Sequence, residues 1–289
     1  MQVNSYKNSA IKIPYMKKLI FLLAVFIYIP MFAQENSILW KVEKDGVVSY
    51  LLGTNHIFGK AFVTDNKKIM GALKSCEVVM LENIQPKDPI INSRKPFGYI
   101  NDLSAEEKAT LEKIIDIKMD AAKYTIKELL LVTQNYWDRQ SCVHSKEQDN
   151  LRMDDFIHEY AITSGKELSG LEDIAETMAF IETEYLKDVD PAKMAASLKY
   201  RLNGIIKNKP QNCDMNDLYA KGKYKFDFKS EVVYNIIYLR NKNWMEKITA
   251  VMADKKSAFI AVGAAHLDYT TGLIALLTAQ GYTVSPVKL

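Results

Sequence analysis

The feature that most constrains this chain is a pattern that occurs twice, about 200 residues apart. "SYLLGTNHIF" (49–58) and "AFIAVGAAHLDY" (258–269) are apolar runs that reach a glycine, and a histidine follows three residues later. Each run has the length and composition of a buried strand. Strands that alternate with helices place their loops at the carboxyl ends of the strands, where open α/β sheets bind ligands. We therefore expect His56 and His266 to lie at one edge of one sheet, although each histidine alone also fits a turn or core residue.

Two carboxylates occupy similar positions. Glu82 follows the apolar run "VVML", and Glu172 ends "ELSGLE". Glu172 has a structural alternative, because an acid in the first turn of a helix is stabilised by the helix dipole. No helix is predicted directly after Glu82, which favours a functional role there. Two histidines with one or two carboxylates would suit zinc, manganese or cobalt, and a metal-bound water would attack a carbonyl while a carboxylate takes its proton.

A buried arginine adds an independent indication. The helix predicted from Phe228 to about Asp254 has an apolar stripe, and Arg240 falls within it. A buried guanidinium must be paired or face a polar cavity. Beside Glu82 or Glu172 it would bind a substrate carboxylate or a developing oxyanion. The alternatives, a structural ion pair or a side chain that extends to the surface, stay open at this stage. The stripe consists of Val233, Ile237, Trp244, Ile248 and Val251.

The remaining polar candidates are weaker. Asp154 borders the apolar face of a helix predicted over 149–164, and we expect it at a solvated edge. Its second interpretation is a hydrogen-bond partner of a site histidine. His144 and His158 lie in polar segments and receive no role. Cys142 and Cys213 also lie in polar segments, where an exported protein permits a disulfide.

The element pattern predicts an α/β fold of one domain over 34–289, with a helical middle region. Strands are expected in a hairpin over 38–54 and near 77–84, 166–172, 257–266 and 282–289. Helices are expected near 64–75, 104–118, 125–138, 149–164, 173–187, 190–206 and 228–254, with a further helix between the last two strands.

The amino terminus predicts export. Residues 1–33 have lysines, then a 13-residue apolar run (19–31) and a small residue at Ala33, as in a signal peptide. Met16 opens a better signal than Met1, so 1–15 are read as an over-extended start. The run is shorter than the roughly 20 residues of a membrane-spanning helix, and an uncleaved anchor is the alternative. Without residues 1–33 the balance is 34 basic to 35 acidic residues, which argues against a nucleic-acid partner or an anionic membrane surface.

The same segments together resemble the TraB/GumN family, which is related to the TIKI proteases. The resemblance implies two related β-sheet and helix halves (EreA/TIKI-like) around a shared central cleft, and a protease that favours manganese or cobalt. Asn55 stands where the family often has an apolar or small residue, and Asn83 and Ile84 replace a more acidic continuation after Glu82. The matching pieces are "LWKVEKDGVVSYLLGTNHIF", "VVMLENI", "MDDFIHEYAITSGKELSGLEDIAE", "LRNKNWMEKI" and "FIAVGAAHLDYTTGLIALLTAQGYTVSPV".

These observations together predict an exported, periplasmic or extracellular metal-dependent hydrolase, most simply a peptidase acting on peptides or proteins. A divalent metal (Mn, Co or Zn) would be held by His56, His266 and Glu82. Glu82, Arg240 and Glu172 are the predicted catalytic residues. The alternative is a cell-envelope protein that sequesters a peptide or a haem-like ligand in the same cleft without turnover.

Overall fold

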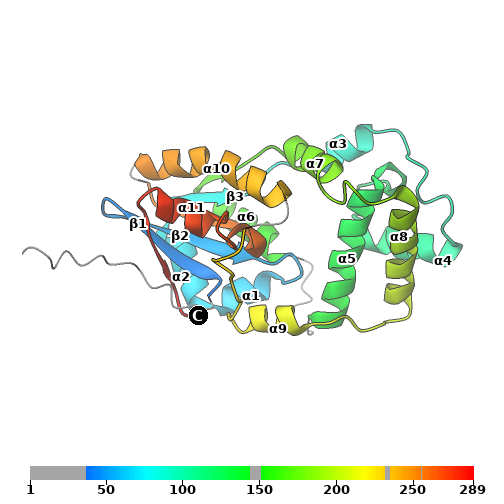
Figure 1. Ribbon diagram of the computed structural model, residues 1–289, viewed down its shortest axis with the longest axis horizontal. Helices are drawn as coiled ribbons and strands as arrows, with labels where there is room; N and C mark the ends of the chain where they lie inside the picture. The colour runs from blue at the N-terminus through cyan, green and yellow to red at the C-terminus, as the bar shows by residue number, and fades with distance from the viewer. Residues whose placement is uncertain (1–36, 144–150, 232–234, 255) are drawn as a thin grey trace, which may run out of the picture. The chain divides into compact units, whose positions relative to one another are not determined.

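Six strands form one sheet in the part of the chain that the computed structural model describes, and their order is β4-β3-β5-β2-β1-β6 (Figure 1). The described residues are 37–143, 151–231, 235–254 and 256–289. They belong to one unit, Gln34–Leu289. The predicted signal segment and His144 lie outside the described residues. The strands are β1 (Leu39–Lys44), β2 (Val47–Thr54), β3 (Val78–Leu81), β4 (Glu167–Gly170), β5 (Ala258–Gly263) and β6 (Thr283–Pro286).

Four neighbouring strands of this sheet run parallel. β5 pairs in parallel with both β2 and β3, and β3 pairs in parallel with β4. β1 is antiparallel to β2 and to β6. The turn between β1 and β2 has Asp45 and Gly46 at φ 51° and 83°, the left-handed conformation that an Asp-Gly hairpin turn adopts readily. The predicted hairpin is therefore present, and it lies beside the parallel strands.

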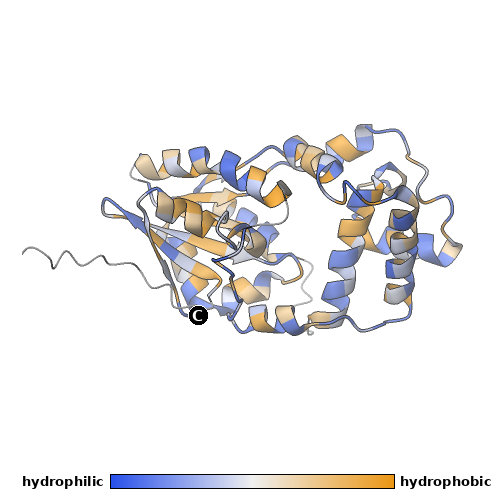
Figure 2. Ribbon diagram, in the orientation of Figure 1, coloured by the Kyte–Doolittle hydropathy of each residue, from blue (hydrophilic) through white to orange (hydrophobic). Residues whose placement is uncertain are grey.

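Helices cover both faces of the sheet, and alternate residues of the parallel strands are therefore buried on opposite sides. Phe259 and Ala261 of β5 pack in a core with α1 (Lys60–Asp65), α2 (Lys67–Ser75), α6 (Met153–Thr163) and α9 (Asp214–Ala220). Ile260 and Val262 pack in a second core with α10 (Asn235–Ala253) and α11 (Leu273–Ala279). Strands buried on both faces read as continuous apolar runs, and Figure 2 shows these strands mostly in the hydrophobic colour.

A third core belongs to the helical middle region. Leu129 and Leu198 are each about 1% exposed or less at the contact between α5 and α8. Trp137 of α5 lies against Gly204 of α8, where a Cβ would overlap the indole ring. The helices of this region are α3 (Asp88–Ser93), α4 (Ala105–Ile114), α5 (Ile126–Cys142), α7 (Ile174–Thr183) and α8 (Pro191–Ile206), with short 3₁₀ turns at Ala121–Lys123 and, after β5, at Ala264–His266.

The α/β class and the helical middle are confirmed, while the division into two related halves stays a prediction. The differences are local. Residues 228–231, where the long helix was expected to begin, are not helical. The helix expected near 64–75 is two helices, because Asn66 adopts an extended conformation and its side chain caps α2 through Lys68 and Ile69. The helix expected through about Lys118 ends at Ile114, where Ile115 is extended. No described helix has the length and apolarity required to cross a membrane.

The two cysteines of the polar segments form a disulfide. Cys142, at the end of α5, is bonded to Cys213, which precedes α9. Cys76 is free and buried, as its position between helix and strand predicts. The disulfide therefore joins the helical middle to α9, which packs in the first core against the sheet.

Candidate functional site

The carboxyl ends of four adjacent parallel strands meet at one edge of the sheet. Thr54 at the end of β2 pairs with Gly263 at the end of β5, and Leu81 at the end of β3 pairs with Gly170 at the end of β4. Each strand end is followed within three residues by a side chain that the sequence singles out. These side chains are His56, Glu82, Glu172 and His266.

Arg240 of α10 joins three of these four side chains. Its Nε donates to Glu172 Oε1 and Oε2 at 3.0 and 3.1 Å. Its NH2 group donates to Glu172 Oε1 and to Glu82 Oε2, both at 2.6 Å. The NH1 nitrogen lies 3.2 Å from His266 Nε2. The guanidinium of Arg240 is thus paired on every side with groups of the site, which settles the question that helix spacing left open.

Burial makes this ion-pair cluster strong and fixed. The side chains of Arg240 and Glu172 are 8% and 5% exposed, while that of Glu82 is 18% exposed. Trp244, one turn along α10, donates its indole N–H to Glu172 Oε2 at 2.9 Å and lies under the guanidinium, 4.7 Å from ring centroid to Cζ. Thr177 donates its hydroxyl to Glu172 Oε1 at 2.5 Å. A helix dipole alone therefore does not explain the position of Glu172, since Arg240 and Trp244 of α10 donate hydrogen bonds to its carboxylate.

The hydrogen bonds of Asn241 fix the tautomer of His266. The amide nitrogen of Asn241 donates to the carbonyl oxygens of His266 and Thr271 at 3.1 and 3.0 Å. Its Oδ1 must then be the acceptor that faces His266 Nδ1 at 2.7 Å. His266 therefore carries its proton on Nδ1, and its Nε2 has a free lone pair that accepts from Arg240. Burial, together with the charge of Arg240, lowers the pKa of His266 to about 3, so the ring is neutral.

Glu82 remains ionised despite its surroundings. Burial alone opposes its charge, but the attraction of Arg240 and the hydrogen bond from the Gly263 amide, at 2.8 Å to Oε1, help to hold the pKa of Glu82 below its usual range. Two paired carboxylates, one guanidinium and a neutral imidazole leave one net negative charge in the cluster. A cation at this partly exposed edge would neutralise that charge.

His56 lies in a different environment. Its Nδ1 is 2.9 Å from Asp154 Oδ2, and the two side chains are 48% and 25% exposed. The charge of Asp154 and its hydrogen bond to Nδ1 raise the pKa of His56 to about 9, so the ring is an imidazolium at neutral pH with its second proton on Nε2. No hydrogen bond between described residues joins His56 to the Arg240 cluster, but its charge acts on the pKa of Glu82. His56 is thus an electrostatic neighbour of the cluster.

The donor chemistry of these residues fits a divalent metal ion in part. Both imidazoles have Nδ1 held by an oxygen, from Asp154 or from Asn241, as in protein metal ligands, but Nε2 of the buried His266 faces Arg240. His266 Nε2 and Glu82 Oε1 are 3.8 Å apart. The described residues contain no group of three or more His, Cys, Asp or Glu side chains already close enough to hold an ion, and Arg240 contacts two of the three donors.

The structure gives each predicted residue a place and adds others. Glu82, Glu172, Arg240 and His266 form one cluster, and their chemical roles stay predictions. Of the two interpretations of Asp154, the structure shows the second, a hydrogen-bond partner of His56, although the carboxylate is still partly exposed. Sequence reasoning missed Asn241, a fully buried polar residue. Its position next to Arg240, in the predicted apolar face of a helix, was the available signal.

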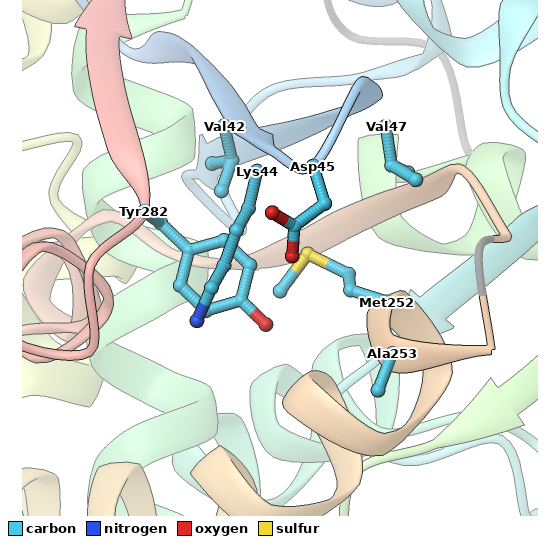
Figure 3. Close-up of a pocket in the computed structure, with 7 residues that line it drawn as sticks. All are labelled: Val42, Lys44, Asp45, Val47, Met252, Ala253 and Tyr282. Atoms are coloured by element: carbon cyan, nitrogen blue, oxygen red, sulfur yellow. The ribbon is translucent and has the colours of Figure 1, made fainter.

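The best-defined pocket lies away from this cluster. Its volume is about 200 Å³, and it lies at the turn between β1 and β2, against the end of α10 (Figure 3). β2 starts at this turn and ends before His56, so the pocket is at the opposite end of the strands. The pocket is lined in part by Lys44, Asp45, Met252 and Tyr282, and it contributes nothing to the site.

Comparison with known proteins identifies a family over almost the whole described chain. No curated protein and no solved structure matches the sequence. Residues 38–286, which include every residue of the cluster and the His56–Asp154 pair, match the sequence model of one family. The chain belongs to the TraB/PrgY/gumN family.

Proposed function

We propose that this protein is an exported hydrolase, most simply a peptidase, whose site is formed by His56, His266 and Glu82 at the strand ends. The observation that carries the proposal is the matched orientation of the two imidazoles. Each Nδ1 is bound to an oxygen acceptor, so a ligand or reacting group would meet each ring at Nε2, which in His266 faces Arg240 NH1 at 3.2 Å. The relation to the TIKI proteases and the cleft between two halves belong to this proposal.

The metal ion is part of the same proposal. A divalent ion (Mn, Co or Zn) held by His56, His266 and Glu82 would polarise a substrate carbonyl as a Lewis acid. The net negative charge of the Arg240 cluster supports a cation there. Metal ligands must be deprotonated, so His56 holds its second proton only while no ion is bound.

The other residues take roles that their geometry supports. The lowered pKa of Glu82 makes it a poor proton acceptor, so it contributes charge and a ligand oxygen. Arg240 holds Glu82 and His266 in position, and Glu172 in turn holds Arg240. The polar atoms of Arg240 and Glu172 are used for these contacts within the cluster. With a metal ion bound, His56 would be a ligand through Nε2; only in a reaction without the ion would it keep its second proton and donate it to a leaving amine. His56 is also the most exposed of the site side chains.

The disulfide supports the export part of the proposal. Disulfides form and persist in secreted and periplasmic proteins and are rare in the cytosol. Cys142 and Cys213 are bonded here, in agreement with the signal segment predicted over 1–33. A periplasmic or extracellular location follows for the mature protein.

The test is cleavage of a peptide library by protein purified without chelator, with and without added Mn²⁺, Co²⁺ or Zn²⁺. We expect His56→Ala and Glu82→Gln to lose activity by about 100-fold or more, while His158→Ala keeps it. His158 is a matched control because it is a histidine of α6 that we place in no site. Equal rates in all variants, or no cleavage with any metal, would count against the hydrolase.

A binding function is the second candidate, and one observation favours it. Arg240 already satisfies both His266 and Glu82, so the cluster is complete without a reacting water. His56, with a solvent-exposed ring, would then be the contact to a peptide or an axial ligand to haem. Recovery of such a ligand intact from the purified protein, with no product formed, would support this alternative.

A further inference from the structure

The helix α9 contacts the loop that carries His56, although the two are about 160 residues apart in sequence. Asn216 Oδ1 accepts a hydrogen bond from Asn55 Nδ2 at 3.1 Å. The hydroxyl of Tyr219 donates to the carbonyl oxygen of Gly53 at 2.7 Å. Tyr219 is fully buried, so its hydroxyl has no access to solvent as an alternative partner.

Asn55 connects both sides of the histidine to α9. Its Oδ1 accepts from the amide of Ile57 at 3.2 Å, while its Nδ2 donates to Asn216. Its own amide approaches the sulfur of Met153 at 3.3 Å. An apolar residue at position 55 would make neither of these side-chain bonds.

Aromatic stacking adds a second attachment after the histidine. The rings of Phe58 and Tyr219 stack with centroids 5.1 Å apart, and Phe62 stacks on Tyr219 at 5.3 Å. The disulfide fixes the other end of α9, because Cys213 is its N-cap residue. The loop is thus held from Gly53 to Phe58 by a helix that is itself covalently tied to α5.

We propose that α9 positions His56, and that Asn216 and Tyr219 are positioning residues for the reaction of this site. The proposal rests on the proposed function in one respect, that His56 is the group whose placement matters. Asp154 orients the imidazole ring, whereas α9 holds the backbone from which the ring projects. Neither Asn216 nor Tyr219 is assigned contact with substrate.

The test measures amide hydrogen exchange in the folded, disulfide-bonded protein. Tyr219→Phe removes the hydroxyl that binds Gly53, and Asn216→Ala removes the acceptor for Asn55. Asn216→Asp keeps an acceptor oxygen at the same place. Met215→Ala is the matched control, because Met215 is 50% exposed on the same helix.

We expect Asn216→Ala and Tyr219→Phe to speed exchange over residues 53–58 by about fivefold, as loss of one net hydrogen bond allows. Exchange in β5 should not change, and Asn216→Asp and Met215→Ala should resemble the natural protein. With a cleaved peptide as substrate, kcat should fall in the first two variants while KM changes little.

Unchanged exchange over 53–58 would overturn the proposal, and so would an equal increase in β5, which would indicate general destabilisation. Faster exchange with unchanged kcat in an active enzyme would also overturn it, since the contact would then be structural only. If the natural protein cleaves nothing, the hydrolase proposal fails, and hydrogen exchange alone still decides whether α9 holds the loop.

Discussion

Replacement of Arg240 by methionine tests whether the cluster is a buried ion-pair network. The substitution keeps an apolar stem but removes the cation shared by Glu82 and Glu172, whose side chains are 18% and 5% exposed. Removal of one partner from a buried ion pair costs about 3–5 kcal/mol, because the remaining charge is left without compensation. At about 2–4 °C per kcal/mol for a domain of this size, the melting temperature should fall by about 6–20 °C.

The pH dependence of this loss identifies its origin. The pKa of Glu82 in the folded protein lies below its usual range, because the attraction of Arg240 outweighs the effect of burial. A carboxylate of this kind contributes stability above the unfolded pKa and loses it as the pH falls through the folded pKa. In Arg240→Met the unpaired carboxylates can take up protons in acid, so the stability difference should be largest near pH 7–8 and should shrink below about pH 5.

The assay is urea unfolding of the natural protein, Arg240→Met and Lys242→Met at several pH values. Lys242 is an exposed residue next to Arg240 on α10, and its substitution should change the free energy of unfolding by about 0.5 kcal/mol or less. A loss in Arg240→Met no larger than that of Lys242→Met, or an equal loss in acid and at neutral pH, would refute the reasoning.

Two further predictions follow from other contacts. The pKa of His56 is about 9 in the folded protein, above the ordinary histidine value of about 6.5. Its contribution to stability is therefore complete below about pH 6.5 and is lost as the pH rises through about 9, so the melting temperature of Asp154→Asn should differ from that of the natural protein more at pH 6 than at pH 10. Gly204→Ala should lose about 1–2 kcal/mol in urea unfolding, because overlap with Trp137 outweighs the gain in helix propensity. Gly71→Ala, in α2 with open space around the added methyl group, should instead gain about 0.5–1 kcal/mol, and equal effects of the two substitutions would contradict this explanation.

The strand ends could be predicted because they follow from local sequence and one topological rule. Apolar runs that end in glycine indicate buried strands, and parallel neighbours bring their carboxyl ends to one edge. The pairing of Thr54 with Gly263 and of Leu81 with Ala261 is the physical expression of that rule. The burial of Arg240 was also predictable, since its position in an apolar helical stripe requires it.

The partners of these residues could not be predicted in the same way. Helical periodicity places Asp154 at the border of an apolar face. The sequence around Asp154 does not indicate that this border faces the loop after β2, which carries His56. The role of Asn216 likewise depends on where the short helix α9 packs. Before this helix the chain is bonded to a cysteine 71 residues earlier in the sequence. Such contacts depend on tertiary packing between distant elements, which local patterns do not encode.

His56 and His266 both lie three residues after the glycine that ends an apolar strand. They show that such a repeated motif predicts where a side chain lies better than it predicts the chemistry of that side chain. Both rings follow parallel strands that are direct neighbours, yet the pKa of His56 is raised to about 9 and that of His266 is lowered to about 3. The difference comes from the helices on opposite faces of the sheet, because α6 presents Asp154 to an exposed ring, while α10 presents Arg240 and Asn241 to a buried one. Environments that separate the pKa values of two like groups assign them different proton roles. At neutral pH His56 can therefore give a proton, whereas Nε2 of His266 can only accept a hydrogen bond or bind a ligand.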